Sequence, residues 1–172
     1  MEELSNFATK HNIPVTQTVM GYSTMKRDHS HYAGQIGGLG GKNTNDLAKE
    51  TDLAIAVGTK LADFTTGSWA NFENEKFKLV SVNVSRFDAN KHLAQAVVGD
   101  AKVSLIELSK ALGDWKVGDE WNEKSQRELK IWNEHIDKES APTNQEVPSY
   151  VQVIGAIYRN SEPTDIAVTA AC

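Results

Sequence analysis

Apolar residues occur along this chain in two patterns, continuous runs and three- or four-residue spacings, and these predict alternating strands and helices. Leu53 to Val57 are all apolar, which is typical of a parallel strand covered on both faces. Strands are predicted over residues 13–19, 53–57, 77–84, 96–98 and 165–171. Helices are predicted over residues 2–11, 44–50, 100–112, 121–138 and 149–160, and residues 21–41 are expected to form a long loop.

Polar residues and a glycine mark the ends of the predicted helices. Asn43 or Thr44 is expected to cap the helix that runs to about residue 50, and Asp100 and Ser149 are expected to cap two later helices. Gly113 follows the apolar stripe of residues 100–112. Glycine commonly ends a helix at such a position because it adopts a left-handed backbone.

The order of these elements predicts an α/β fold. Strands alternate with helices through short connections, which favours a Rossmann-like parallel sheet with helices on both faces. After Gly113 the chain becomes strongly charged, and residues 140–148 are polar with two prolines, as in a linker. The first helix has no strand before it and the last strand has no helix after it. We therefore expect the fold to be truncated at both ends.

Composition narrows the class of protein. Of the 172 residues, 40% are hydrophobic and 24% are charged, as in an ordinary globular domain. The net charge of −5 and the lack of a basic stripe argue against a nucleic-acid partner. No apolar run approaches the roughly 20 residues that cross a bilayer. The first residues do not resemble a signal peptide and Cys172 is the one cysteine, so we expect a cytoplasmic protein without internal disulfides.

A glycine cluster precedes the helix predicted at residues 44–50 and is a candidate phosphate site. Backbone N–H groups of Gly38, Gly40 and Gly41 could approach an anion at the start of that helix. The spacing does not match the dinucleotide fingerprint, because no third glycine stands where that motif requires one. A tight turn that packs the helix against the sheet is therefore favoured over phosphate binding.

Polar residues also follow two of the predicted strands. Gly58, Thr59 and Lys60 come directly after residues 53–57, and Asn83 lies near the end of the next strand. Ligands of open α/β sheets bind at the carboxyl ends of the strands, so a ribose or pyrophosphate site is one reading of these residues. Local capping of backbone N–H groups by Asp63 is the other, and the two remain open.

Other polar groups carry weaker signals. Arg86 and Asp88 are expected to form a salt bridge within a loop. His29 and His31 are two residues apart, yet no further ligand stands at a zinc spacing, so no metal site is predicted. No Ser-His-Asp, Cys-His or paired-carboxylate arrangement is present, and no catalytic residue is predicted.

Three stretches together resemble a known enzyme family. They are DLAIAVGTKLADFTTGSW at residues 52–69, VSVNVSRFDANKH at residues 80–92 and VVGDAK at residues 97–102. They look like the middle domain of thiamine-diphosphate-dependent enzymes, in particular those that hydrolyse trihydroxycyclohexane-1,2-dione in myo-inositol breakdown. Residues 142–171 look like the opening of the pyrophosphate-binding domain of the same family.

The resemblance implies a division of the chain and a chemistry. Residues 1–115 would be a middle domain without its first strand, residues 116–146 a charged helix and linker, and residues 147–172 the start of the C-terminal domain. The full enzyme would use thiamine diphosphate and magnesium to open the cyclic dione by adding water, giving 5-deoxyglucuronate. Thr169, Ala170 and Ala171 would lie at the edge of the thiamine-diphosphate site, and glycine rather than Cys172 would be expected next.

The resemblance also implies what this stretch lacks. The activating glutamate of the family lies in its N-terminal domain, and its Gly-Asp-Gly magnesium motif does not occur in this sequence. Relatives such as acetolactate synthase bind FAD in the middle domain through the glycine cluster and the loops after Gly58 and Val82. Their Arg-Phe-Asp-Asp-Arg type sequence is replaced here by residues 60–64, which argues against flavin binding. We therefore expect an inactive, scaffolding fragment that binds no cofactor itself. Its partners would be the missing domains of the same chain and further copies in a homo-oligomer. The alternative is a free-standing module that binds NAD, FAD or ADP.

Overall fold

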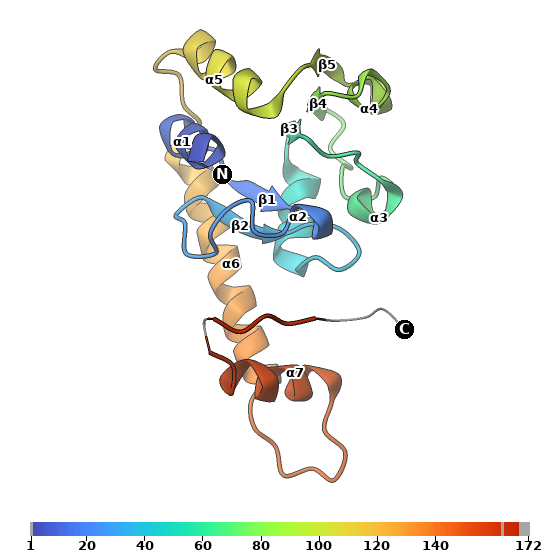
Figure 1. Ribbon diagram of the computed structural model, residues 1–172, viewed down its shortest axis with the longest axis vertical. Coiled ribbons are helices and arrows are strands. Elements are labelled where there is room, and N and C mark those ends of the chain that lie inside the picture. The colour runs from blue at the N-terminus through green and yellow to red at the C-terminus, as the bar shows by residue number, and fades with distance from the viewer. Residues whose placement is uncertain (1, 163, 169–172) are drawn as a thin grey trace. The chain divides into compact units, whose positions relative to one another are not determined.

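Parallel strands and flanking helices make up the computed structural model, which describes residues 2–162 and 164–168 (Figure 1). The chain divides into two compact units, residues 1–130 and residues 131–172. The elements in chain order are α1 (Glu2–His11), β1 (Val15–Gln17), η1 (Val19–Gly21), β2 (Tyr32–Gln35), α2 (Lys42–Glu50), β3 (Leu53–Val57), α3 (Asp63–Thr66), β4 (Lys78–Asn83), α4 (Arg86–Ala89), η2 (Lys91–Leu93), β5 (Gln95–Val98), α5 (Ala101–Leu112), α6 (Asp119–Glu139) and α7 (Tyr150–Arg159).

The strands form two parallel sheets, one of β3-β4-β5 and one of β1-β2. Leu53 pairs with Lys78 and Val57 with Val82, so β3 and β4 end at the same edge. The parallel α/β fold with helices on both sides of the strands is confirmed. Strand β2 is not predicted by the sequence and lies inside the expected loop of residues 21–41. Gly34 within it has a φ of 104°, which lets a strand with a turn-like composition pack closely on α2.

Several predicted ends of helices are confirmed. The Asp100 side chain accepts a hydrogen bond from the Val103 N–H at 3.0 Å. Ser149 caps α7 through a reciprocal capping box with Gln152. Gly113 ends α5 with a φ of 59°.

The cap predicted for α2 is wrong. Gly41 stands at the N-cap and makes no side-chain cap hydrogen bond. Asn43 and Thr44 lie inside the first turn instead, where both side chains are buried. They donate to the Ala33 carbonyl, from Thr44 Oγ1 at 2.9 Å and from Asn43 Nδ2 at 3.3 Å. Their donor groups thus satisfy the Ala33 carbonyl of β2, a strand that the sequence pattern does not reveal, while Asn43 Oδ1 is buried without a partner.

Two strand predictions also need correction. Strand β3 is not covered on both faces along its whole length, since Leu53 is 47% exposed at the edge of its sheet. The strand predicted at residues 165–171 is not formed at Asp165–Val168, and its remaining residues, Thr169–Ala171, lie outside the described residues. An apolar run becomes a strand only beside a neighbour that pairs with its backbone, and the paired strands of the described residues all lie between Val15 and Val98.

The core of the first unit joins α1 to the β1-β2 sheet. Ala8, Met25 and Tyr32 form a buried cluster, against which the side chains of Leu4, Val15 and Leu129 pack. Helix α1 also lies against α5, and His11 connects them, with Nδ1 donating to the Trp115 carbonyl at 2.6 Å and Nε2 at 2.9 Å from Ser109 Oγ. These contacts hold α1 against α5.

The second unit consists of the later part of α6, a polar connection and α7. Arg159 Nη1 donates to the Ser140 carbonyl at 2.7 Å, and Gly155 lies so close to Ser140 that a Cβ there would collide with it. Apolar side chains cover much of the exposed surface of α7, including those of Tyr150 and Ile154. In the part of the chain that the structure describes, no helix is long and apolar enough to cross a membrane.

Candidate functional site

The carboxyl ends of β3 and β4 bring together three of the predicted site residues. The Gly58 N–H donates to the Val82 carbonyl at 2.8 Å, and Asn83 Nδ2 donates to the Thr59 carbonyl at 3.1 Å. Asn83 Oδ1 accepts from the Ser85 N–H at 2.9 Å. The Asn83 amide thus clamps the two strand ends, and both of its polar atoms are engaged within the protein.

Gly58 leaves open space at this edge. Its φ is 65°, and a Cβ built there would meet nothing within 4 Å. Lys60 is exposed two residues further on. The hydrogen bond from Lys91 is the largest of the influences that lower the pKa of Asp88, and the charge of Lys60 is the smallest. The edge is therefore accessible at Gly58 and Lys60.

A stacked pair of rings joins the loop after β3 to the loop after β4. The His92 ring lies on Trp69 with centroids 4.2 Å apart and 23° between the planes. His92 Nε2 also donates to the Leu61 carbonyl at 3.2 Å. The sequence pattern marks His92 as an isolated residue, because nothing local indicates a partner that lies 23 to 31 residues away.

The residues of this junction adopt an uncommon backbone. Leu61, Trp69 and His92 have φ values of 46°, 72° and 59°, in the left-handed region that side chains disfavour. Each such residue costs about 1 kcal/mol or more, so the junction persists because stacking and hydrogen bonds hold it. Strained non-glycine backbone of this kind clusters at functional sites in many proteins.

Asp88 pairs with a different cation from the one predicted. Its carboxylate lies 2.9 Å from Lys91 Nζ rather than against Arg86. The hydrogen bond from Lys91 holds the pKa of Asp88 below its usual value, with a further hydrogen bond from Ser85. Arg86 starts the short helix α4, so its side chain is directed away from a residue two positions later in the same turn.

The glycine cluster forms a tight turn. The N–H groups of Gly38, Gly40 and Gly41 donate to the carbonyls of Phe64, Gly37 and Gln35, at 2.9, 2.8 and 3.0 Å. A Cβ on Gly40 would collide with the Gln35 carbonyl. Because these donors are already used within the protein, the arrangement favours the structural turn over the phosphate-binding reading.

Asn45 holds this turn from within α2. Its Oδ1 accepts from the Gly37 N–H at 3.0 Å and from Asn71 Nδ2 at 3.2 Å. Its Nδ2 donates to the Gly37 carbonyl at 3.1 Å. One carboxamide therefore ties the glycine turn, α2 and the loop after α3 together, a role the sequence does not indicate.

The two neighbouring histidines are engaged in hydrogen bonds. His31 Nε2 donates to Asn12 Oδ1 at 3.0 Å, and its Nδ1 is 3.0 Å from Ser30 Oγ. Burial lowers the pKa of His31 below its ordinary value, and the nearby charge of His29 lowers it further. Within residues 2–162 and 164–168, no group of three or more His, Cys, Asp or Glu residues could hold a metal ion.

Comparison with known proteins identifies a family and several relatives. A family model described as the central domain of thiamine pyrophosphate enzymes matches residues 1–108. A 3D-(3,5/4)-trihydroxycyclohexane-1,2-dione hydrolase of Clostridium perfringens (strain 13 / Type A) is 37% identical over 137 residues, covering 80% of this chain and 21% of the relative.

Relatives from other bacteria give the same picture. Hydrolase 2 of that name from Bacillus cereus is 43% identical over 107 residues, covering 62% of this chain and 17% of the relative. The corresponding hydrolase of Bacillus anthracis is 42% identical over the same length, with the same coverage. The chain thus spans about a fifth of the length of the curated relatives it matches.

Proposed function

The chain belongs to the thiamine pyrophosphate enzymes, whose central domain it matches, and from this premise we propose that it is part of a cyclic-dione hydrolase. The whole protein would open trihydroxycyclohexane-1,2-dione by adding water across a C–C bond, giving 5-deoxyglucuronate in myo-inositol catabolism. The identity of 37% to 43% with proteins named as hydrolases of that dione is the observation that carries the proposal.

Within that protein, we assign this stretch a scaffolding role. The polar groups of the candidate site are engaged within the protein: Asn83 at the sheet edge with Thr59 and Ser85, and Asn45 in α2 with the glycine turn. Groups that are already paired hold loops in place and have little capacity left for a reacting atom. The isolated chain is therefore expected to catalyse nothing.

We propose that thiamine diphosphate is held mainly outside the described residues. A diphosphate with its metal needs carboxylate or carbonyl ligands, and the described residues contain no acidic or histidine cluster that could hold the ion. Thr169, Ala170 and Ala171, which the resemblance places at the edge of that site, lie outside the described residues. Thiamine diphosphate and magnesium would therefore be held mainly by parts of the enzyme beyond this stretch.

The partners of this stretch follow from the same proposal. It would pack against the other domains of its own polypeptide, and whole subunits would assemble into a homo-oligomer in the cytoplasm. Exposed apolar side chains on α7, among them Tyr150, Ile154 and Tyr158, suit such packing.

An assay on the whole protein tests the activity. Purified full-length enzyme with thiamine diphosphate and magnesium should convert the cyclic dione to an acid. Chromatography of the reaction mixture measures the amount of this product. The 172-residue chain under the same conditions should produce none. Conversion of pyruvate to acetolactate in place of the dione reaction would contradict the assigned substrate, and turnover by the short chain would contradict the scaffolding role.

A nucleotide-binding module is the second candidate, favoured by the open space at Gly58 beside Thr59 and Lys60. Titration of the chain with ADP, NAD and FAD in a calorimeter separates the two readings. Saturable micromolar binding that a Gly58→Val substitution abolishes would support the module. Flat titrations with all three nucleotides would exclude the nucleotide-binding module and leave the scaffolding role as the remaining reading.

A further inference from the structure

A cavity of about 360 Å³ lies at the carboxyl end of β1, and none of its lining residues belongs to the loops after β3 and β4. Its lining comes from Gln17 at the end of the strand and from the loop that follows: Gln17, Tyr22, Ser23, Met25, Lys26 and Arg27. This volume lies within the range of small-molecule sites, and the carboxyl end of a parallel strand is a common position for them.

The loop that forms the cavity is fixed at its base. The Met25 side chain is buried in the core with Ala8 and Tyr32. Gln17 is 2% exposed, and its Nε2 donates to the Met25 carbonyl at 2.9 Å and to Thr24 Oγ1 at 3.2 Å. The base of the loop is therefore held in place before any ligand arrives, which reduces the ordering that binding requires.

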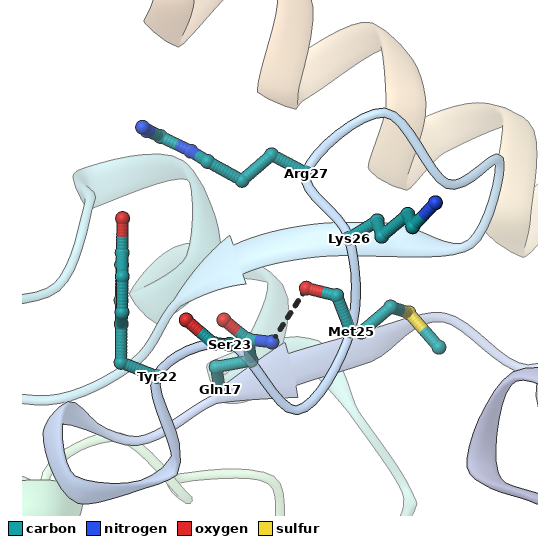
Figure 2. A pocket seen from close by; sticks show the side chains of 6 residues that line it. All are labelled: Gln17, Tyr22, Ser23, Met25, Lys26 and Arg27. Carbon is teal, nitrogen blue, oxygen red and sulfur yellow. Dashed lines mark hydrogen bonds between the residues drawn. The ribbon is translucent and has the colours of Figure 1, made fainter. Parts of the chain in front are cut away.

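Side chains with hydrogen-bond donors stand around the opening. Figure 2 shows Tyr22 and Arg27 extending to the same side of the loop, with the Ser23 hydroxyl below them and Lys26 directed away. Neither Lys26 nor Arg27 forms a salt bridge with any carboxylate of the described residues. An unpaired guanidinium that extends to the same side as the Tyr22 hydroxyl is a local attraction for an oxyanion in a chain of net charge −5.

We propose that this cavity binds a phosphate monoester of a small organic molecule. Arg27 would hold two phosphate oxygens through its guanidinium, while the hydroxyls of Tyr22 and Ser23 donate to the ester side. The Tyr22 ring would contact the carbon skeleton. Lys26 would add positive charge without direct contact. This site is independent of the dione hydrolase activity, whose substrate is uncharged.

Calorimetric titration of the 172-residue chain with phenyl phosphate tests the proposal, with benzoate and inorganic phosphate as comparison ligands. We expect saturable binding of phenyl phosphate with a Kd on the order of 0.1–1 mM, and weaker binding of both comparison ligands. Arg27→Met, which keeps the apolar stem, should weaken binding at least about tenfold, and Tyr22→Phe should weaken it by roughly threefold.

Lys116→Met is the matched control, because it removes an exposed lysine in the connection between α5 and α6, far along the chain from the cavity. It should leave binding unchanged, and circular dichroism should show the same fold for all variants. If Lys116→Met and Arg27→Met weaken the binding of phenyl phosphate equally, the effect comes from the net charge of the chain, and the proposed site is overturned. Absence of saturation at about 10 mM phenyl phosphate would overturn it as well. Benzoate or inorganic phosphate binding as tightly as phenyl phosphate would overturn the assigned ligand class.

Discussion

Replacing Asn45 with alanine should destabilise the first unit, because one carboxamide makes three hydrogen bonds there. It accepts from the Gly37 N–H and Asn71 Nδ2 and donates to the Gly37 carbonyl, at 3.0, 3.2 and 3.1 Å. At about 1 kcal/mol for each part-buried hydrogen bond, the loss is about 3 kcal/mol. Alanine is a better helix former than asparagine by about 0.6 kcal/mol, so the expected net destabilisation is about 2–2.5 kcal/mol.

Urea unfolding followed by tryptophan fluorescence measures this change, since Trp69 belongs to the same unit. Asn45→Asp keeps both acceptor contacts but turns a carboxylate oxygen toward the Gly37 carbonyl, so it should also be destabilised relative to the unchanged chain. Asn90→Ala serves as the control, because its exposed amide makes a single contact with the Arg86 carbonyl within its own helical turn. The reasoning is refuted if Asn45→Ala lies within about 0.5 kcal/mol of the unchanged chain, the range of ordinary surface substitutions.

Three further predictions concern backbone, capping and pH. Gly34→Ala should lower the melting temperature by more than Gly58→Ala, since both need a positive φ but only the Cβ at Gly34 would collide with Thr44 Oγ1; equal shifts would contradict the packing. Asp100→Ala should lower the free energy of unfolding in urea by about 1 kcal/mol, and Asp100→Asn should lower it much less, because asparagine also caps helices. Equal destabilisation of the two variants would argue against the cap on the Val103 N–H. Burial holds the pKa of His31 below that of the unfolded chain, so the unfolded state takes up the proton first as the pH falls through about 6.5. Stability should therefore decrease below that pH, and His31→Gln should flatten the decrease in unfolding curves measured between about pH 5 and 8.

The sequence predicts the β3-β4-β5 sheet and α5 closely, because their signals are local. Continuous apolar runs define β3 and β4, and Asp100 and Gly113 mark the two ends of α5. Each of these signals lies within a few residues of the element it specifies. The structure departs from prediction by only one residue at either end of β4.

The remaining features depend on contacts between distant parts of the chain. Strand β2 contains Gly34 and follows a histidine-rich loop, so its pairing with β1 is decided by packing on α2. Asn43 and Thr44 are residue types that commonly cap helices. Here their side chains donate to the buried Ala33 carbonyl and do not cap the N-terminus of α2. The junction of His92 with Trp69 is equally hidden, since neither residue has a distinctive local neighbour.

The stacked rings at the sheet edge give the protein an internal optical reporter. An imidazole 4.2 Å from an indole is close enough to quench its emission, so any movement that separates the two loops should brighten Trp69. Subtracting the spectrum of a Trp69→Phe variant isolates this signal from the chain's other indoles. Docking of a neighbouring domain at that edge could then be followed in real time without attaching a dye.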